Sequence, residues 1–281
     1  MEARSAAVGS PPLRYMFPDN DGLRSADAAR LLAAAPGVVP RILPDLHVGA
    51  GGAVASAASL FANAPTPGFT QGAINCETNA GTHDLQRALD EAADLIAWFT
   101  ADTAVTDRLY ARTASFCTGS SNNFDSWDQS LSMFLPNMTW LQPPGHVHAM
   151  VKATWAETSL AAAVAGGGSQ APFAAQRTAD GKTLVLRVVN SGGGALPVQV
   201  ALAGSGAAAA AAGPTFTLWT LGGQGLSRAA DNSPANVDNV APVRADVPIA
   251  AGARALNVTL EATQFAVLVI PLQGANCAAV C

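Results

Sequence analysis

The spacing of the apolar residues changes near residue 156, and this change constrains the fold more than any other feature of the sequence. Upstream, segments with apolar residues three and four positions apart alternate with short apolar runs. From 173 to 272, apolar residues recur at every second position between Gly, Pro, Asn and Asp. The first pattern predicts a parallel sheet built from βαβ units, and the second predicts an antiparallel β-sandwich. We therefore expect an α/β domain over residues 1–155 and an all-β domain over residues 156–281.

One helix and one strand stand out within these two parts. Apolar residues recur at helical spacing over 83–99, and Thr82 is a suitable N-cap for this helix. The run from Phe265 to Leu272 is apolar throughout, which predicts a central strand covered on both faces. We expect Trp98 and Trp219 to lie in the core.

The composition excludes several classes of protein. Charged residues make up 12% of the 281 residues and apolar residues 49%, whereas an intrinsically disordered chain has the opposite balance. The 15 basic residues do not cluster and the net charge is −5, so we expect no nucleic-acid partner. No apolar run approaches the roughly 18 residues that a membrane-spanning helix needs. No residue pattern indicates a metal ion or another cofactor.

Four cysteines and two glycosylation sequons bear on the cellular compartment. The cysteines are Cys76, Cys117, Cys277 and Cys281, and the sequons begin at Asn137 and Asn257. The first two cysteines could form one disulfide and the last two another, whereas the spacing fits no common zinc site. These features favour an extracellular or secretory-pathway protein. Residues 1–18 show no signal-peptide pattern, so secretion would require an N-terminus other than this one.

Glu77 is the most informative acidic residue. It follows the apolar run Ala73-Ile-Asn-Cys76 and precedes a loop and the predicted helix. In an α/β barrel, catalytic groups gather at the carboxyl ends of the strands. Glycoside hydrolysis uses two carboxyl groups, one that attacks or stabilises the sugar and one that protonates the leaving oxygen. From the residues alone, Glu77 is either such a carboxylate or an exposed glutamate at a strand end.

Four segments, taken in their order along the chain, resemble a known enzyme family. They are Gly72 to Leu95, Arg112-Thr-Ala-Ser-Phe116, Val188-Val-Asn190, and Asp231-Asn-Ser-Pro-Ala-Asn236 leading to Val240-Ala-Pro242. Their order is similar to that in the α-L-arabinofuranosidases of glycoside hydrolase family 51, from the seventh barrel strand into the C-terminal sandwich. The resemblance implies a fold of α/β followed by all-β type, with part of a (β/α)8 TIM-type barrel and a jelly-roll-like sandwich.

The resemblance also implies a retaining glycosidase that releases terminal α-L-arabinofuranose from arabinose-containing polysaccharides or glycoproteins. Glu77 stands at the position of the family's nucleophile. Asp45-Leu-His47 resembles the family's Asp-x-His, so His47 would lie beside Glu77 and the sugar, or else make a purely structural hydrogen bond. Asn79 would contact the substrate, and Trp127 would line the sugar pocket or lie in the core.

The acid/base position departs from the family. The family has a glutamate in an Asn-Glu pair, and the nearest match is Asn20-Asp21, so Asp21 is the candidate although its side chain is one methylene shorter. The alternative is that the acid/base lies upstream of Met1 or has been lost. In addition, Thr78 stands where the family has a tyrosine. These departures favour a second hypothesis, a catalytically inactive family member that serves as a carbohydrate-binding or structural subunit.

The length of the first domain is short for a complete barrel. A (β/α)8 barrel takes about 250 residues, and only the first 155 residues precede the predicted sandwich. We therefore expect the second half of a barrel. Because open sheet edges favour association, we expect the remaining strands to come from another chain, a longer precursor or a homo-oligomer.

Overall fold

The computed structural model describes residues 82–104, 131–162, 171–202, 211–250 and 253–273, with short stretches at 15–17, 30, 33–37, 42–44, 74–75 and 112–113. The chain forms two compact units, one made of Met1–Asn79 with Ala101–Phe116 and the other of Ala80–Thr100 with Cys117–Cys281. The second unit contains helical residues that precede residue 156 as well as the strands that follow it. The domain boundary at 155 stays a prediction.

The described strands of the first unit form two parallel pairs. β1 (Tyr15–Phe17) pairs with β2 (Ile42–Pro44), and β3 (Ile74–Asn75) pairs with β4 (Arg112–Thr113). Parallel neighbours require a crossover connection rather than a tight hairpin. Parallel strand pairs of this kind are what the predicted α/β domain requires.

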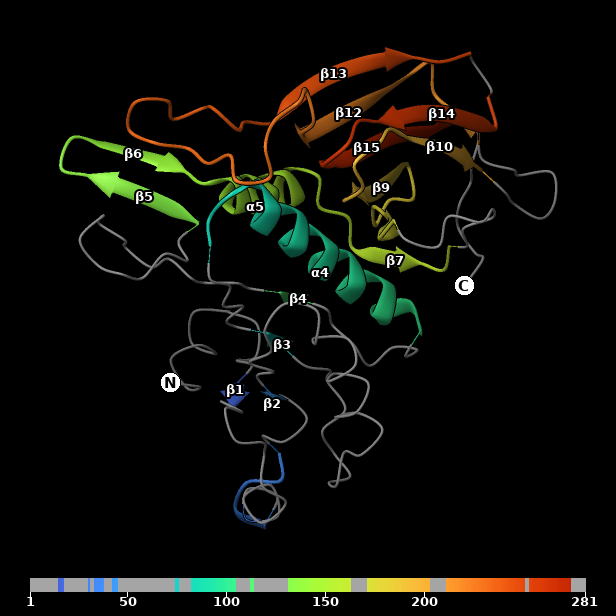
Figure 1. The fold of residues 1–281 in the computed structure, drawn as a ribbon. Coiled ribbons are helices and arrows are strands. Elements are labelled where there is room, and N and C mark those ends of the chain that lie inside the picture. The colour runs from blue at the N-terminus through green and yellow to red at the C-terminus, as the bar shows by residue number, and fades with distance from the viewer. Residues whose placement is uncertain are drawn as a thin grey trace. The chain divides into compact units, whose positions relative to one another are not determined.

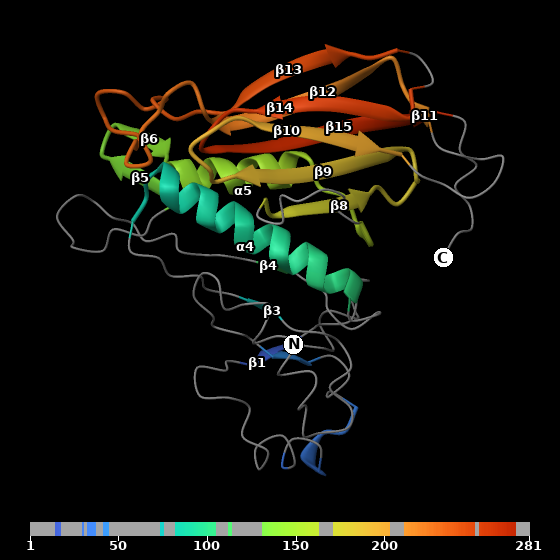
Figure 2. The same cartoon turned by 45° about the vertical axis from the view of Figure 1, so that its right-hand side comes forward.

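The second unit is built around a large antiparallel sheet (Figure 1). Its strands are β7 (Thr158–Leu160), β8 (Phe173–Arg177), β9 (Thr183–Asn190), β11 (Ala211–Ala212), β12 (Thr215–Gly222), β13 (Val243–Pro248) and β15 (Gln264–Gln273). They lie in the order β13-β12-β15-β9-β8-β7, with β11 beside β15. A small antiparallel sheet of β10 (Leu196–Ala201) and β14 (Ala255–Leu260) covers one face (Figure 2). The predicted β-sandwich is confirmed.

β15 lies in the middle of the large sheet and is buried on both faces, as its apolar run predicts. Phe265 and Val267 belong to the hydrophobic core between the sheet and the helices. Ala266, Leu268 and Ile270 belong to the core between the two sheets. All five side chains are 0% exposed. The strand therefore joins two apolar layers into one unit.

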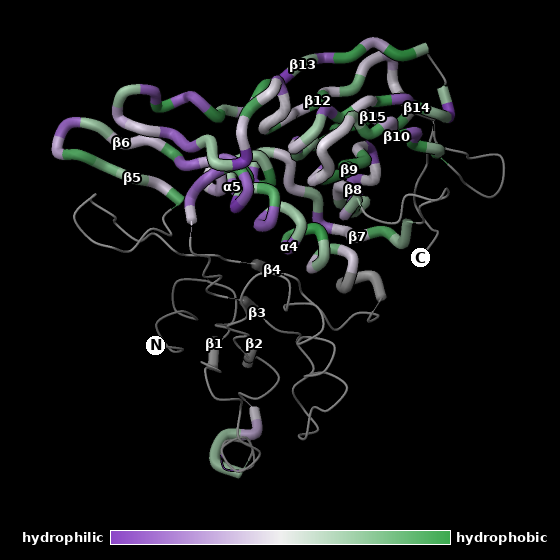
Figure 3. Tube along the Cα trace, viewed as in Figure 1, coloured by the Kyte–Doolittle hydropathy of each residue, from purple (hydrophilic) through white to green (hydrophobic). Residues whose placement is uncertain are grey.

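α4 (Leu85–Ala104) confirms the helix predicted over 83–99 and extends it by five residues. The N-cap is Asp84 and not Thr82, because the Asp84 carboxylate accepts the backbone N–H of Arg87 at 3.0 Å. The Thr82 hydroxyl donates to that same carboxylate at 3.3 Å. Figure 3 shows the hydrophilic residues of α4 in its first turns and more hydrophobic ones farther along.

The second helix of this unit follows a β-hairpin. The hairpin consists of β5 (Ser132–Leu135) and β6 (Met138–Leu141), and α5 (Pro143–Ala153) begins two residues later. The chain packs closely between the hairpin and α5, where a Cβ on Gly145 would clash with the carbonyl oxygen of Leu131. α4 and α5 together cover the face of the large sheet opposite the small sheet (Figures 1 and 2).

Replacement of Phe265 by alanine tests whether the covering of β15 stabilises the unit. We expect Phe265→Ala to lower the free energy of unfolding by about 3–5 kcal/mol, because it leaves a cavity in a fully buried layer. Phe134→Ala is the matched control, since Phe134 is 43% exposed on β5, and it should cost less than about 1 kcal/mol. Chemical denaturation followed by circular dichroism measures both. Equal losses in the two variants would contradict the assignment.

Candidate active site

The residues predicted to form the active site lie outside the described residues. They are Asp21, His47, Glu77, Asn79 and Trp127. Their catalytic and substrate-binding roles stay predictions. The structure does describe a short strand before each of three of them in the sequence.

Each of these strands ends shortly before its candidate residue. β3 ends at Asn75, two residues before Glu77. β1 ends four residues before Asp21, and β2 ends three residues before His47. Because β1 and β2 are parallel, with Phe17 opposite Pro44, their carboxyl ends lie at the same edge of the pair. β3 is also paired in parallel, and the carboxyl ends of such strands are where α/β barrels collect catalytic groups.

The helix after Glu77 begins at a well-defined point. The backbone N–H of Leu85 donates to the carbonyl oxygen of Ala230, and that of Gln86 donates to Arg228, both at 2.8 Å. With the Asp84 cap, three of the N–H groups that every helix leaves unpaired at its start have partners. The guanidinium of Arg228 also donates to the side-chain oxygen of Gln86. Eight residues after Glu77, at Leu85, the chain is therefore bound to a loop of the sandwich.

Asn232 is a buried polar residue whose role the sequence analysis missed. It is 2% exposed. Its amide nitrogen donates to the carbonyl oxygens of Leu141 at 2.8 Å and Val240 at 3.0 Å, and its side-chain oxygen accepts the Val240 N–H at 2.7 Å. Its own carbonyl oxygen accepts from Gln142 at 2.9 Å and Trp140 at 3.2 Å. The only signal for Asn232 in the sequence was the Asn-rich composition of 231–236. In the structure, Asn232 connects the sandwich loop to the hairpin and α5.

A charged cluster joins the two helices. The guanidinium of Arg87 lies 2.6 Å from one oxygen of Glu91, and Nε2 of His148 lies 2.9 Å from the other. The Glu91 side chain is only 3% exposed. A carboxylate engaged on both oxygens within a helix–helix contact is a structural ion pair rather than a free acid. Glu91 was not among the predicted site residues, and this geometry gives it no catalytic role.

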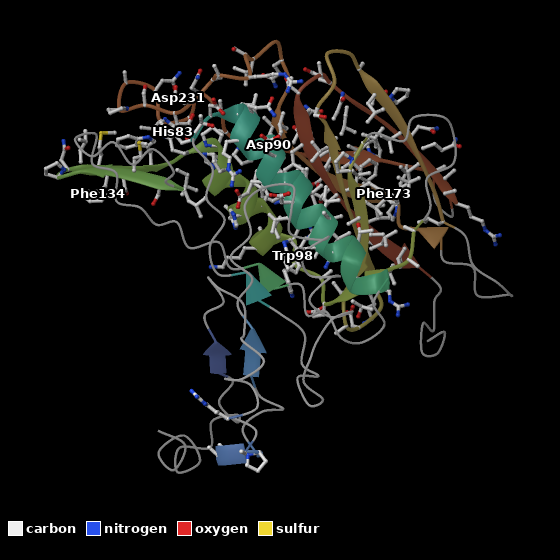
Figure 4. The ribbon with its side chains drawn as sticks, turned by 60° about the horizontal axis from the view of Figure 1, so that its bottom comes forward. His83, Asp90, Trp98, Phe134, Phe173 and Asp231 are labelled. Atoms are coloured by element: carbon white, nitrogen blue, oxygen red, sulfur yellow. The ribbon has the colours of Figure 1, made fainter. Side chains whose placement is uncertain are left out.

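The remaining histidines of this region lie apart from one another. Nε2 of His83 lies 3.4 Å from an Asp231 carboxylate oxygen, at the start of α4 (Figure 4). His146 is half-buried on α5, and its Nε2 has no hydrogen-bond partner in the part of the chain that the structure describes. Among the described residues, no three His, Cys, Asp or Glu side chains gather closely enough to hold a metal ion.

No protein-family model matches the chain, and no curated protein does either. Solved structures do match. An arabinose-bound family 51 α-L-arabinofuranosidase aligns over 96% of this chain and 42% of its own, with a TM-score of 0.65 and 15% identity. The α-L-arabinofuranosidase of Thermotoga maritima aligns over 96% and 60%, with a TM-score of 0.64 and 14% identity.

The fold is that of the family 51 α-L-arabinofuranosidases. These matches confirm the fold that the motifs predicted, which combines a partial barrel with a β-sandwich. The chain spans 42% and 60% of the length of these two structures. A family 30 xylanase C from Talaromyces cellulolyticus also aligns, over 96% of this chain and 54% of its own, with a TM-score of 0.55 and 14% identity. Solved structures that are described as acting on different sugars therefore share this fold.

The features that bear on location lie mostly at the surface or outside the described residues. Asn137 is exposed in the turn between β5 and β6. Asn257 is exposed on β14, where its side-chain oxygen accepts from Gln199 at 3.1 Å. All four cysteines lie outside the described residues, so their pairing stays a prediction. None of the described helices of this family 51 fold has the length and hydropathy needed to cross a membrane.

His146 should titrate below the ordinary histidine range. Burial disfavours the imidazolium and lowers the pKa of His146, while the Asp238 carboxylate opposes this with a smaller effect. The folded state thus binds fewer protons than the unfolded state at acidic pH. The stability that neutral His146 contributes is present above the unfolded pKa of 6.5 and is lost as pH falls through the lower folded pKa.

An NMR titration of the His146 ring protons checks this expectation, with His146→Gln used to assign the signal. The same variant should lose less stability than the wild type between pH 7.5 and pH 5.5. A folded-state pKa at or above 6.5 would contradict the expectation.

Proposed function

We propose that this chain carries the nucleophile of a retaining glycoside hydrolase that releases terminal α-L-arabinofuranose from arabinose-containing polysaccharides or glycoproteins. The observation that supports it most is that β3, which ends two residues before Glu77 in the sequence, pairs in parallel with β4 in a chain whose fold matches that of family 51 structures. Solved structures with this fold are described as α-L-arabinofuranosidases, two of them with arabinose bound.

The proposed chemistry follows the retaining mechanism. Glu77 attacks the anomeric carbon while a second carboxyl group protonates the leaving oxygen, and water then hydrolyses the glycosyl-enzyme. Asp21 is the proposed acid/base, and the two carboxyl groups would lie about 5–5.5 Å apart. His47 would lie beside Glu77 and contact the sugar, as would Asn79 and Trp127. The remaining barrel strands would come from another chain, a longer precursor or a second copy.

Two residues favour the alternative of an inactive family member that binds carbohydrate or serves as a structural subunit. Asp21 is shorter than a glutamate, and a displacement of about 1 Å can lower a rate roughly 100-fold. Thr78 removes the phenol that the resembling enzymes place after the nucleophile. An extracellular or secretory location is part of both proposals and is supported by the sequons at Asn137 and Asn257.

Glu77→Gln separates the two functions. With the native protein and its natural partner, we expect this variant to hydrolyse p-nitrophenyl α-L-arabinofuranoside at least about 1,000-fold more slowly than the wild type, because an amide cannot act as the nucleophile. Glu157→Gln is the matched control, since Glu157 is an exposed glutamate whose carboxylate accepts the N–H of Ala179 at 2.8 Å, a bond that an amide oxygen can also accept. It should keep the wild-type rate.

The other outcomes are equally informative. Activity retained in Glu77→Gln would remove Glu77 from the mechanism. A wild-type protein without activity, in the presence of its partner, would support the inactive subunit instead.

A further inference from the structure

The sandwich has a hollow on the face of the large sheet that α5 also contacts. Its volume is about 390 Å³, within the range of small-molecule sites. It lies where α5 ends at Ala153 and the chain turns through Trp155 towards β7. Trp155 and Trp219 both line it, together with Arg244 of β13. Trp219 was expected in the core, and it is instead half-buried at this hollow because the end of α5 leaves its strand partly uncovered.

The strand register shows how far the hollow extends across the sheet. Thr217 on β12 lies opposite Val269 on β15, which in turn lies opposite Val185 on β9. All three line the hollow, and Arg244 extends it onto β13. Neighbouring strands are about 4.8 Å apart, so the four strands span roughly 14 Å. The hollow therefore reaches across four neighbouring strands, a span that suits a chain-like ligand.

The wall formed by Trp155 is held in place before any ligand binds. The Trp155 ring packs edge-on against Phe99, with centroids 6.0 Å apart. The adjacent Thr154 is fixed by Arg187, whose guanidinium donates to the Thr154 carbonyl oxygen at 2.7 Å. Arg187 itself is fully buried, and its burial lowers its pKa to about 10. Trp155 is nevertheless 41% exposed, so part of a rigidly placed aromatic ring faces solvent. Such preorganisation reduces the entropic cost of binding.

The polar groups around the rings favour a neutral ligand rich in hydroxyl groups. The Arg244 guanidinium lies 5.7 Å from the centre of the Trp219 ring and 4.0 Å from the Asp246 carboxylate. The Thr217 hydroxyl donates to that carboxylate at 2.7 Å. The positive and negative groups offset one another, and a lone arginine cannot provide the basic surface that nucleic acid requires. Aromatic faces combined with charged hydrogen-bonding groups suit the C–H faces and hydroxyls of a sugar.

We propose that this hollow binds a short segment of a neutral glycan chain, so that the sandwich holds the polymer in addition to the proposed catalytic site. Sugar rings stack on the exposed part of Trp155 and beside Trp219, and Arg244 donates hydrogen bonds to their hydroxyls. Arabinose-containing polymers are chosen for the test because of the proposed function. The inference that the hollow binds a neutral glycan rests only on its aromatic and polar side chains and does not depend on that function.

Affinity gel electrophoresis in gels containing arabinan or arabinoxylan tests the proposal with the full chain. The wild type should be retarded, and Trp155→Ala should bind at least tenfold more weakly. Arg244→Ala should weaken binding at least threefold. The Arg244 side chain is 59% exposed, so this variant should fold normally. It therefore tests the proposal even if Trp155→Ala unfolds through loss of the Phe99 contact. Arg254→Ala is the matched control, an exposed arginine outside the hollow, and should be retarded like the wild type.

Glu77→Gln distinguishes this proposal from the proposed function. Retardation of that variant to the wild-type extent, whether or not the wild type hydrolyses any glycoside, supports binding at the hollow. Loss of retardation in Glu77→Gln would assign the binding to the catalytic carboxylate and overturn the proposal. The proposal is also overturned if neither polymer retards the wild type, or if Trp155→Ala and Arg244→Ala bind as tightly as it does.

Discussion

The second unit depends on β15, a strand that must be covered by apolar groups on both faces. Its even-numbered residues from Ala266 to Ile270 need the small sheet, and Phe265 and Val267 need the helices. Neither layer alone would exclude water from the strand, and a Phe or Val side chain left exposed forfeits about 1.5–3 kcal/mol. This requirement explains why α4 and α5, although they precede residue 156, pack with the sandwich in one compact unit.

Polar contacts then determine where these layers meet. The start of α4 donates its backbone N–H groups to a sandwich loop, and buried Asn232 joins the same loop to the hairpin and α5. Arg87 and His148 bind the two oxygens of Glu91 between the helices. Buried polar groups are costly unless paired, so these contacts select one packing among many apolar alternatives. The helix that follows the Glu77 segment therefore has a defined starting point.

The proposed functions place two kinds of carbohydrate contact on one chain. A carboxylate beyond a parallel strand suits bond cleavage, where charge develops in the transition state. A pair of partly exposed tryptophans beside Arg244 suits holding a polymer without reacting with it. An enzyme acting on the end of a long glycan benefits from both, because binding at a second point raises the local concentration of substrate at the first.

The elements whose signal is local could be predicted from the sequence. Alternation along β14, the double-sided burial of β15, the helix over 83–99 and the strand before Glu77 all follow from the spacing of neighbouring residues. Which polar residues are buried, and which tryptophans are partly exposed, depends on how these elements pack against one another. Asn232, Arg187 and Glu91 form hydrogen bonds with residues that are distant from them in the sequence and belong to other elements of the fold. Trp219 borders a hollow because α5 ends nearby. The residues next to Trp219 in the sequence cannot indicate where a different element ends.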